Sequence, residues 1–519
     1  MDFLVAAWGD PWSWEEVEYE GLGRRVESVT SLSLLRSLYP ESRILIVVQE
    51  TLLAANRYDR RNRRVIERGY PDPWEEIRRG SEYREALVKL AEAVKGFAVG
   101  EFEKRSLPTE DIKVAVAPGT GIFGYLNEDN EVRKFGWRLS ENLMDRGIDV
   151  FSLYQSVAML HILHEMLESG EELTVHLDLT HGLNYASTGI YRALLFASRV
   201  YATLNATSVA IKIYNSEPYN RLGEKKLHLW RIRDEVITRK KALSRLFYAL
   251  SLAEKGEAPR SAIFDLGPKS GELYRKFGNE VVAPLEDLRK IGDYAGPAAF
   301  YGLPLLLLQA GFEADQGKNK DVGSVLKDCI EKLFDFFPSV EVGEQNGIRY
   351  VEHRTAPVLN GLKALLASVA MASYAARAWE RSGRPPTMDG CVTATMEHLR
   401  GVREWIAGPL KPVVDHELSM LECASRGKPV SAVGLYGDLK EASARCRSGV
   451  TLPRRAQGEV QPNKRILVAH SGFQEGTVEV TCLNGEPAVR YRPEALKRVK
   501  EAAKGLKGEL CKMLVETKE

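Results

Sequence analysis

Short apolar runs alternate with helical patterns through the first 215 residues, and this alternation constrains the fold more than any other feature of the sequence. Six runs rich in Val, Ile and Leu are expected to be strands, at residues 3–8, 43–49, 112–118, 149–153, 173–180 and 208–214. Strands covered on both faces have near-continuous apolar sequences of this kind, as in a parallel sheet. We therefore expect a doubly wound, Rossmann-like α/β domain over residues 1–215.

Helical periodicity fills the gaps between these runs and dominates the rest of the chain. Within the first domain the helical patterns cover residues 23–38, 81–99, 154–169 and 185–204. Beyond it they cover residues 241–254, 303–311, 323–336, 359–379, 393–406 and 494–507. Strand signals return only at 477–483 and 488–491, where the intervening Asn484-Gly485 predicts a hairpin. The pattern predicts a mainly α-helical region after residue 215.

Charge and cysteine usage exclude several classes of protein. The chain has 72 Lys+Arg against 71 Asp+Glu, a balance that excludes a histone-like polycation but not a local basic site. All 6 cysteines follow residue 328 without a CxxC pair, so we expect buried thiols rather than a zinc ribbon. No apolar stretch is long enough to cross a membrane, and the N-terminus lacks the basic start of a signal peptide. We expect a cytoplasmic protein with no membrane partner.

Glycine-containing turns follow three of the expected strands. Their sequences are Trp8-Gly9-Asp10-Pro11, Pro118-Gly119-Thr120-Gly121 and the longer run from Asp178 to Asn184. Glycine lets backbone N–H groups approach a ligand closely, and the last turn also opens a helix, whose N-terminus favours anions. Each turn alone is ordinary, but three at one sheet edge favour a phosphate-bearing ligand. Neither a Walker A motif nor GxGxxG is present, which disfavours an ordinary ATPase or dehydrogenase.

These turns carry a family resemblance. The run DLTHGLN ending at Asn184 resembles the signature of the CARF domain in the Csx1 group of CRISPR-associated proteins, and FLVAAWGDPWSWEEVEYE and APGTG resemble two further motifs of that family. The resemblance implies a domain that binds a cyclic oligoadenylate, with four adenylates favoured, across the interface of a homodimer or a larger assembly of dimers. It implies no cofactor. The implied ligand contacts are Gly9, Asp10, Gly119, Thr120, Thr180, His181, Gly182 and Asn184.

The same family carries a C-terminal HEPN nuclease domain, marked by Arg, four to six residues and His. Arg465 and His470 fit this motif, and the following residues also resemble the family's. A second match, Arg221 with His228, lies in a charged segment poorly suited to an active site. The family has a polar residue after the Arg, whereas this chain has Ile466 there and Asn463 two residues before. The resemblance implies a sensor at 1–215, a helical connecting region, helix-turn-helix-like in the family, at 216–380, and a HEPN domain at 381–519.

The implied activity is metal-independent cleavage of single-stranded RNA in type III CRISPR antiviral defence. RNA is cut when its 2′-OH attacks the adjacent phosphate. A histidine serves as general acid or base for this reaction, and an arginine stabilises charge on the phosphoryl oxygens. A five-residue separation turns Arg465 and His470 about 140° apart on a helix. In the family, the Arg–His motifs of two subunits meet in one cleft, which brings Arg and His side chains together despite this angular separation. Arg465, His470 and Asn463 are the catalytic candidates.

Two other functions remain open. The chain is alternatively a nucleotide-sensing regulator, whose helical region binds DNA or protein without catalysis. A third possibility is a ring nuclease that cuts the cyclic messenger with Thr180 or His181. His161 and His164 share a helix face, but the HExxH order and a third ligand are missing, so no metal site is expected.

Overall fold

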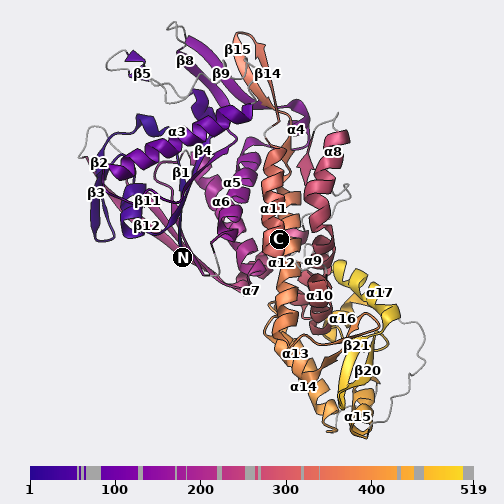
Figure 1. The fold of residues 1–519 in the computed structure, drawn as a ribbon. Coiled ribbons are helices and arrows are strands. Elements are labelled where there is room, and N and C mark those ends of the chain that lie inside the picture. The colour runs from indigo at the N-terminus through magenta and orange to yellow at the C-terminus, as the bar shows by residue number, and fades with distance from the viewer. Residues whose placement is uncertain are drawn as a thin grey trace, which may run out of the picture.

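An eight-stranded mixed sheet forms the N-terminal part of the protein, in the order β3-β2-β12-β11-β10-β1-β4-β7 (Figure 1). The computed structural model describes residues 1–54, 58–59, 64–65, 83–126, 132–169, 172–182, 184–218, 225–251, 263–266, 271–316, 321–337, 339–428, 434–448 and 461–506. The strands are β1 (Asp2–Ala7), β2 (Val17–Gly21), β3 (Arg24–Ser28), β4 (Arg43–Gln49), β7 (Ile112–Ala117), β10 (Leu173–Asp178), β11 (Val209–Ser216) and β12 (Lys226–Ile237). Neighbours in the series β11-β10-β1-β4-β7 are parallel. The prediction of an N-terminal α/β domain is confirmed.

Both faces of the sheet are covered, as the continuous apolar strands require. In β1, Phe3, Val5 and Ala7 enter one core, which α5 (Val150–Leu167) and α6 (Asn184–Leu204) cover. Leu4, Ala6 and Trp8 enter a second core, to which α1 (Leu32–Leu38) and α3 (Tyr83–Glu103) contribute. The alternation follows from the two-residue period of a strand.

Two predicted elements differ from the structure. Residues 149–153 do not form a strand, because the carboxylate of Asp149 accepts the backbone N–H of Ser152 at 2.6 Å and caps the start of α5. The predicted helix at 23–38 begins only at Leu32. Its first part is β3, which pairs with β2 across a turn where Leu22 and Gly23 both have positive φ, the conformation of a tight hairpin.

The sheet extends past residue 215, and a hairpin from the connecting region completes a second sheet. The long strand β12 pairs antiparallel with β11 and parallel with β2. Further along, β14 (Val340–Gln345) and β15 (Ile348–His353) join β9 (Val132–Leu139) and β8 (Gly121–Leu126) in the order β14-β15-β9-β8. Strand β15 pairs with β9 in parallel. The chain therefore returns to the N-terminal domain after residue 340.

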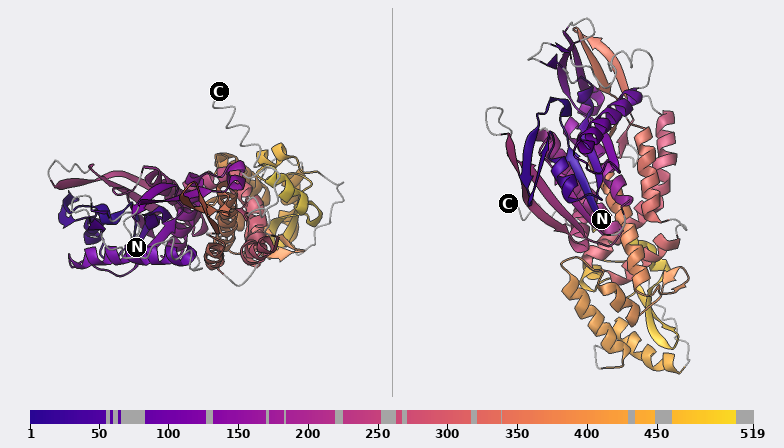
Figure 2. Two further views of the ribbon diagram at one scale, coloured as in Figure 1. Left: turned by 90° about the horizontal axis from the view of Figure 1, so that it is seen from above. Right: turned by 60° about the vertical axis from the view of Figure 1, so that its left-hand side comes forward.

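The helical region extends away from the sheet, and its C-terminal elements lie at the opposite end of the molecule (Figures 1 and 2). Its helices are α7 (Arg239–Ser251), α8 (Gly271–Phe277), α9 (Ala283–Tyr301), α10 (Pro304–Gln316), α11 (Val322–Asp335), α12 (Leu359–Arg381), α13 (Met396–Arg403), α14 (Lys411–Ser425), α15 (Gly434–Arg447), α16 (Lys464–Ala469) and α17 (Pro493–Lys504). The predicted hairpin is β20 (Val478–Leu483) with β21 (Glu486–Tyr491). Among the helices of the described ranges, none is long and apolar enough to cross a membrane.

The cysteines only partly follow the expectation of buried thiols. Cys329 and Cys391 are free and buried. Cys446 of α15 and Cys482 of β20, however, form a disulfide although they are 36 residues apart. This spacing gave no pairing signal, because the contact exists only after α15 packs on the hairpin. Cys511 lies outside the described residues.

Candidate functional site

The loops after β1 and β10 meet at the topological switch point of the sheet. From β1 the chain proceeds outward through β4 to β7, whereas β10 and β11 occupy the other side of β1. The backbone N–H of Gly9 donates to the carbonyl of His181 at 2.9 Å, which joins the two loops. Ligands of open α/β sheets bind in the crevice at this point, beyond the carboxyl ends of the strands.

His181 is fixed as a neutral side chain. Its ring stacks on Trp14 with the centroids 3.9 Å apart. Its Nε2 atom lies 3.3 Å from the backbone nitrogen of Ser31 and 3.1 Å from the hydroxyl of Tyr19. Since a backbone N–H only donates, Nε2 is the acceptor and the ring proton lies on Nδ1. Burial also lowers the pKa of His181 to about 3. The ring therefore shapes the loop and is poorly suited to act as a general base at neutral pH.

Asp178 and Thr180 stabilise the same loop through hydrogen bonds. Buried Asp178 accepts the hydroxyl of Ser31 at 2.7 Å and the backbone N–H of Thr180 at 3.0 Å, and burial raises its pKa. The hydroxyl oxygen of Thr180 accepts the backbone N–H of Ser216 at 3.2 Å. Gly182 is closely packed: a Cβ there would lie 2.3 Å from Oγ of Ser187 and 3.2 Å from Cβ of Ala7, so a larger residue would require the Ser187 side chain to move. Asn184 is the first residue of α6.

The third loop lies two strands away from β1, since β4 separates β1 from β7. Thr120 donates its hydroxyl to the carbonyl of Trp137 at 3.2 Å, and the loop continues into β8 rather than into a helix. A Cβ on Gly119 would lie 2.6 Å from a methyl carbon of Thr51, so the backbone is closely packed there. Asp10 of the first loop accepts the backbone N–H of Trp12 at 3.2 Å. All three predicted turns thus lie at one edge of the sheet, with the third farther from the switch point.

Glu50, which the sequence analysis did not single out, anchors this third loop. Its Oε1 atom accepts the backbone N–H of Gly119 at 2.9 Å and lies 2.6 Å from Nε2 of His353. Its Oε2 atom accepts the hydroxyl of Tyr83 at 2.6 Å, and Tyr83 in turn accepts the indole N–H of Trp137 at 2.8 Å. An acid directly after an apolar strand was a usable signal for Glu50. Nothing local marked His353, which reaches it from β15.

The second candidate site lies at the other end of the molecule, on the short helix α16. Arg465 is exposed and, with Val468 and Ala469, lines a hollow of about 690 Å³ bounded by Tyr301 and Leu506. His470 ends the helix and does not line this hollow. Its Nδ1 atom lies 3.3 Å from Oε1 of Glu417 on α14, with the side chain 51% exposed. The two residues therefore share one helix but face different surroundings within a single chain.

Asn463 begins α16. Its side-chain oxygen accepts the backbone N–H groups of Arg465 at 2.9 Å and Ile466 at 3.3 Å, which is an N-cap. Its own backbone N–H donates to the side chain of Gln474 at 2.9 Å. Asn463 thus positions the backbone that carries Arg465. Ile466 exposes 44% of its surface beside them.

The remaining histidine candidates are used for packing and ion pairs. His161 stacks on Phe334 with the centroids 4.1 Å apart, and burial lowers its pKa to about 4. Nε2 of His164 lies 2.9 Å from a carboxylate oxygen of Glu331. In the parts of the chain that the structure describes, no group of three or more acidic, His or Cys side chains is arranged to hold a metal ion. Arg221 of the second Arg–His match lies outside the described residues.

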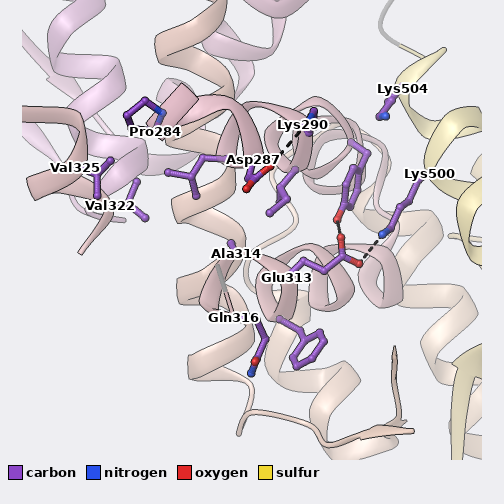
Figure 3. A pocket seen from close by; sticks show the side chains of 14 residues that line it. Pro284, Asp287, Lys290, Glu313, Ala314, Gln316, Val322, Val325, Lys500 and Lys504 are labelled. Carbon is purple, nitrogen blue, oxygen red and sulfur yellow. Dashed lines mark hydrogen bonds and ion pairs between the residues drawn. The ribbon is translucent and has the colours of Figure 1, made fainter. Parts of the chain in front are cut away.

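A further cavity, of about 500 Å³, opens where α9, α10 and α11 meet α17 (Figure 3). Glu313 at its side accepts hydrogen bonds from Tyr294 and Lys500, both at 2.5 Å, and from Gln309 at 2.7 Å. Glu313 thus links α9, α10 and α17, and both of its carboxylate oxygens accept hydrogen bonds. None of the residues nominated from the sequence lines the cavity, and we assign it a packing role.

A largely parallel sheet with glycine-containing loops gathered at one edge, joined to a helical region, defines a two-part protein: a doubly wound α/β domain with a loop edge of the kind that binds ligands, and a separate helical part. Comparison with known proteins narrows this class. Residues 3–218 match the family described as CRISPR system endoribonuclease Csx1, CARF domain. Over 234 residues the chain is 30% identical to the CRISPR system endoribonuclease Csx1 of Methanocaldococcus jannaschii. That stretch covers 45% of this chain and 40% of the relative.

Proposed function

We propose that the protein is an endoribonuclease of CRISPR antiviral defence that cleaves single-stranded RNA without a metal after its CARF domain binds a cyclic oligoadenylate. The observation that carries the proposal is the Csx1 CARF match over residues 3–218, on the domain whose loops meet at the switch point. We propose a ring of four adenylates as the activator.

The sensor loops suit a ring of phosphates and adenines. Backbone N–H groups and hydroxyls at the loops after β1, β7 and β10 match phosphate oxygens, while Asn184 and Thr180 are the types of side chain that read adenine edges. A two-fold symmetric ring requires each subunit of an isologous dimer to read half of it. The proposal therefore includes a homodimer, or a larger assembly built from dimers.

For the cleavage step, we assign His470 as general acid or base and Arg465 as the group that stabilises the phosphoryl charge. The contact between His470 and Glu417 favours one orientation of the imidazole. Because Arg465 and His470 face different surroundings in one chain, a second subunit is needed to bring an Arg and a His to the same phosphate. Exposed Ile466 beside Arg465 fits a face that such a partner covers. Ligand binding shifts the population toward the paired state.

The test measures cleavage of a fluorescent single-stranded RNA by the full chain, with and without cyclic tetra-adenylate, in EDTA. We expect cleavage only with the nucleotide, unchanged by EDTA and lost in His470→Ala. The matched control is His416→Ala, which removes an exposed histidine of α14 next to Glu417. Loss of activity in EDTA, or full activity of His470→Ala, contradicts the assignment.

The same assay separates the two alternative functions. Nucleotide binding without RNA cleavage indicates the regulator, in which α16 has a structural role. Conversion of cyclic tetra-adenylate into linear products, followed by mass spectrometry, indicates a ring nuclease. The acceptor role of His181 Nε2 and its low pKa count against this residue as the base of such a reaction.

A further inference from the structure

Basic side chains gather in a cavity of about 530 Å³ at the junction between the sheet and the helical region. Arg199 of α6 and Lys240, Lys241 and Arg245 of α7 line it, together with Glu235 at the end of β12. Ala407, which follows α13, closes one side. The cavity is separate from both the sensor loops and the hollow beside Arg465.

The charges in this cavity are not balanced. Glu235 lies 3.0 Å from a guanidinium nitrogen of Arg233 and is thus already paired. Among the described residues, Arg199, Lys240, Lys241 and Arg245 form no ion pair. Four cations around a single carboxylate, which also pairs with Arg233, leave an excess of positive charge, and this excess suits the cavity to bind an anion.

The basic character continues from the cavity along the neighbouring helices. Burial lowers the pKa of Arg199, and the nearby Arg245 adds to this. On α12, burial lowers the pKa of Lys363 to about 8, with Arg192 and Arg199 contributing repulsion. Arg192, Arg199 and Lys363 thus extend the positive charge from the cavity along α6 and α12. A positive region larger than the cavity itself suits more than one phosphate.

The face of α7 favours a single strand over a small anion. Lys241, Arg245 and Tyr248 follow one another at helical spacings of four and three residues, so they share one face. Tyr248 exposes 45% of its surface. Cations followed by an exposed aromatic ring suit a nucleic acid strand whose bases are unpaired, because phosphates meet the charges and a base stacks on the ring.

We propose that this basic cavity, defined by Arg199, Lys240, Lys241 and Arg245, binds the phosphate backbone of single-stranded RNA. The inference rests on the proposed function and locates part of the substrate path. The cavity borders Ala407, α14 begins at Lys411, and Glu417 of that helix contacts His470. RNA held in the cavity would thus contact Ala407, in the loop that leads into the helix carrying Glu417.

The test uses full-length His470→Ala protein, so that RNA is bound without being cut, and follows the anisotropy of a fluorescein-labelled 20-nucleotide RNA. Adding Lys241→Glu and Arg245→Glu is expected to raise Kd about tenfold or more and to reduce the slope of log Kd against log salt by about 1.4. The control adds Arg24→Glu and Lys95→Glu, two exposed residues of β3 and α3, which change the net charge equally. An unchanged Kd, or an equal loss in the control, overturns the proposal.

Two further experiments, an alanine double variant and a competition assay, exclude other interpretations. Lys241→Ala with Arg245→Ala, checked for an unchanged melting temperature, is expected to weaken RNA binding in the same direction; no weakening in this folded variant overturns the proposal. The proposal is also overturned if unlabelled duplex DNA displaces the labelled RNA more strongly than unlabelled single-stranded RNA does. Displacement of the labelled RNA by cyclic tetra-adenylate overturns the proposal as well. RNA binding that depends on the cavity, in a protein that never cleaves RNA, refutes the proposed function and leaves this site standing.

Discussion

Glu50 and His353 stand 303 positions apart in the sequence, yet Oε1 of Glu50 lies 2.6 Å from Nε2 of His353. Both side chains are buried, and the same carboxylate oxygen accepts the backbone N–H of Gly119 in the loop after β7. Strand β15 is therefore joined to this loop through one carboxylate. Replacing His353 with Ala leaves part of this buried network without a partner.

We expect His353→Ala to lower the free energy of unfolding by about 1–3 kcal/mol, the usual cost of an unsatisfied buried polar group. Urea denaturation followed by circular dichroism measures the change. His416→Ala, which removes an exposed histidine, is the control and should change the stability by less than about 0.5 kcal/mol. Equal stability of the two variants contradicts the role of the buried contact.

Gly119→Ala should weaken binding of the proposed cyclic oligoadenylate, whereas Gly96→Ala should not. A Cβ at position 119 would lie 2.6 Å from a methyl carbon of Thr51, so either the Thr51 side chain or the loop must move. At position 96, on α3, nothing lies within 4 Å, and alanine favours a helix by up to about 1 kcal/mol over glycine. Calorimetric titration with cyclic tetra-adenylate should show weaker binding only for Gly119→Ala. Equal affinity of both variants rules out close packing at Gly119 as a requirement for the site.

His176 should make the protein less stable as the pH falls below neutrality. It is fully buried, and burial lowers its pKa to about 4 although Asp2 lies 2.7 Å away. The unfolded chain takes up the proton below pH 6.5 while the folded chain does not, so stability is present above 6.5 and lost toward 4. The loss approaches about 1.4 kcal/mol per pH unit for this proton.

Urea midpoints at pH 7, 6 and 5 test the effect of His176. In His176→Gln the decline over this range should be shallower than in the unmodified protein, because one proton fewer is linked to unfolding. The comparison concerns the slope, so a uniform loss of stability in the variant does not affect it. An identical slope in both proteins shows that His176 is protonated in the folded state as readily as in the unfolded one.

Asn463 offers a test of capping against direct catalysis. Asn463→Asp keeps an N-cap oxygen, whereas Asn463→Ala removes it and should cost about 1 kcal/mol. If Asn463 acts by positioning Arg465, RNA cleavage by the Asp variant should stay close to that of the parent, and the Ala variant should be slower. A strong loss in both, with the fold intact, assigns the amide itself to the reaction.

The disulfide between Cys446 and Cys482 should support the C-terminal hairpin. It closes a loop between cysteines that are 36 positions apart, a constraint that is typically worth about 2–4 kcal/mol. We expect Cys482→Ser to lower the thermal midpoint of unfolding, and a reductant to lower that of the parent but not of the variant. Equal sensitivity of both proteins to reductant places the effect at other cysteines.

Local sequence patterns determined the parallel strands, most helices, the Asn484-Gly485 hairpin and the three glycine turns. These features depend on side chains within a few positions of one another, as the alternation of Phe3 and Leu4 between two cores shows. Residues 23–38 and 149–153 were predicted wrongly because turn and cap hydrogen bonds, at Leu22-Gly23 and Asp149, override a short apolar run. The catalytic assignment of Arg465, His470 and Asn463 stays a prediction.

Only the tertiary structure decided which distant side chains share an environment. The pairing of Glu50 with His353, the fixed tautomer of His181, the disulfide and the basic cavity all join residues that no sequence period relates. The sequence determined that the chain carries an α/β domain with its glycine-containing loops at one sheet edge, since burial and turn chemistry are local. The contacts between this domain, the hairpin of β14 and β15 and the helices depend on how whole elements pack, so they are set only in the folded chain.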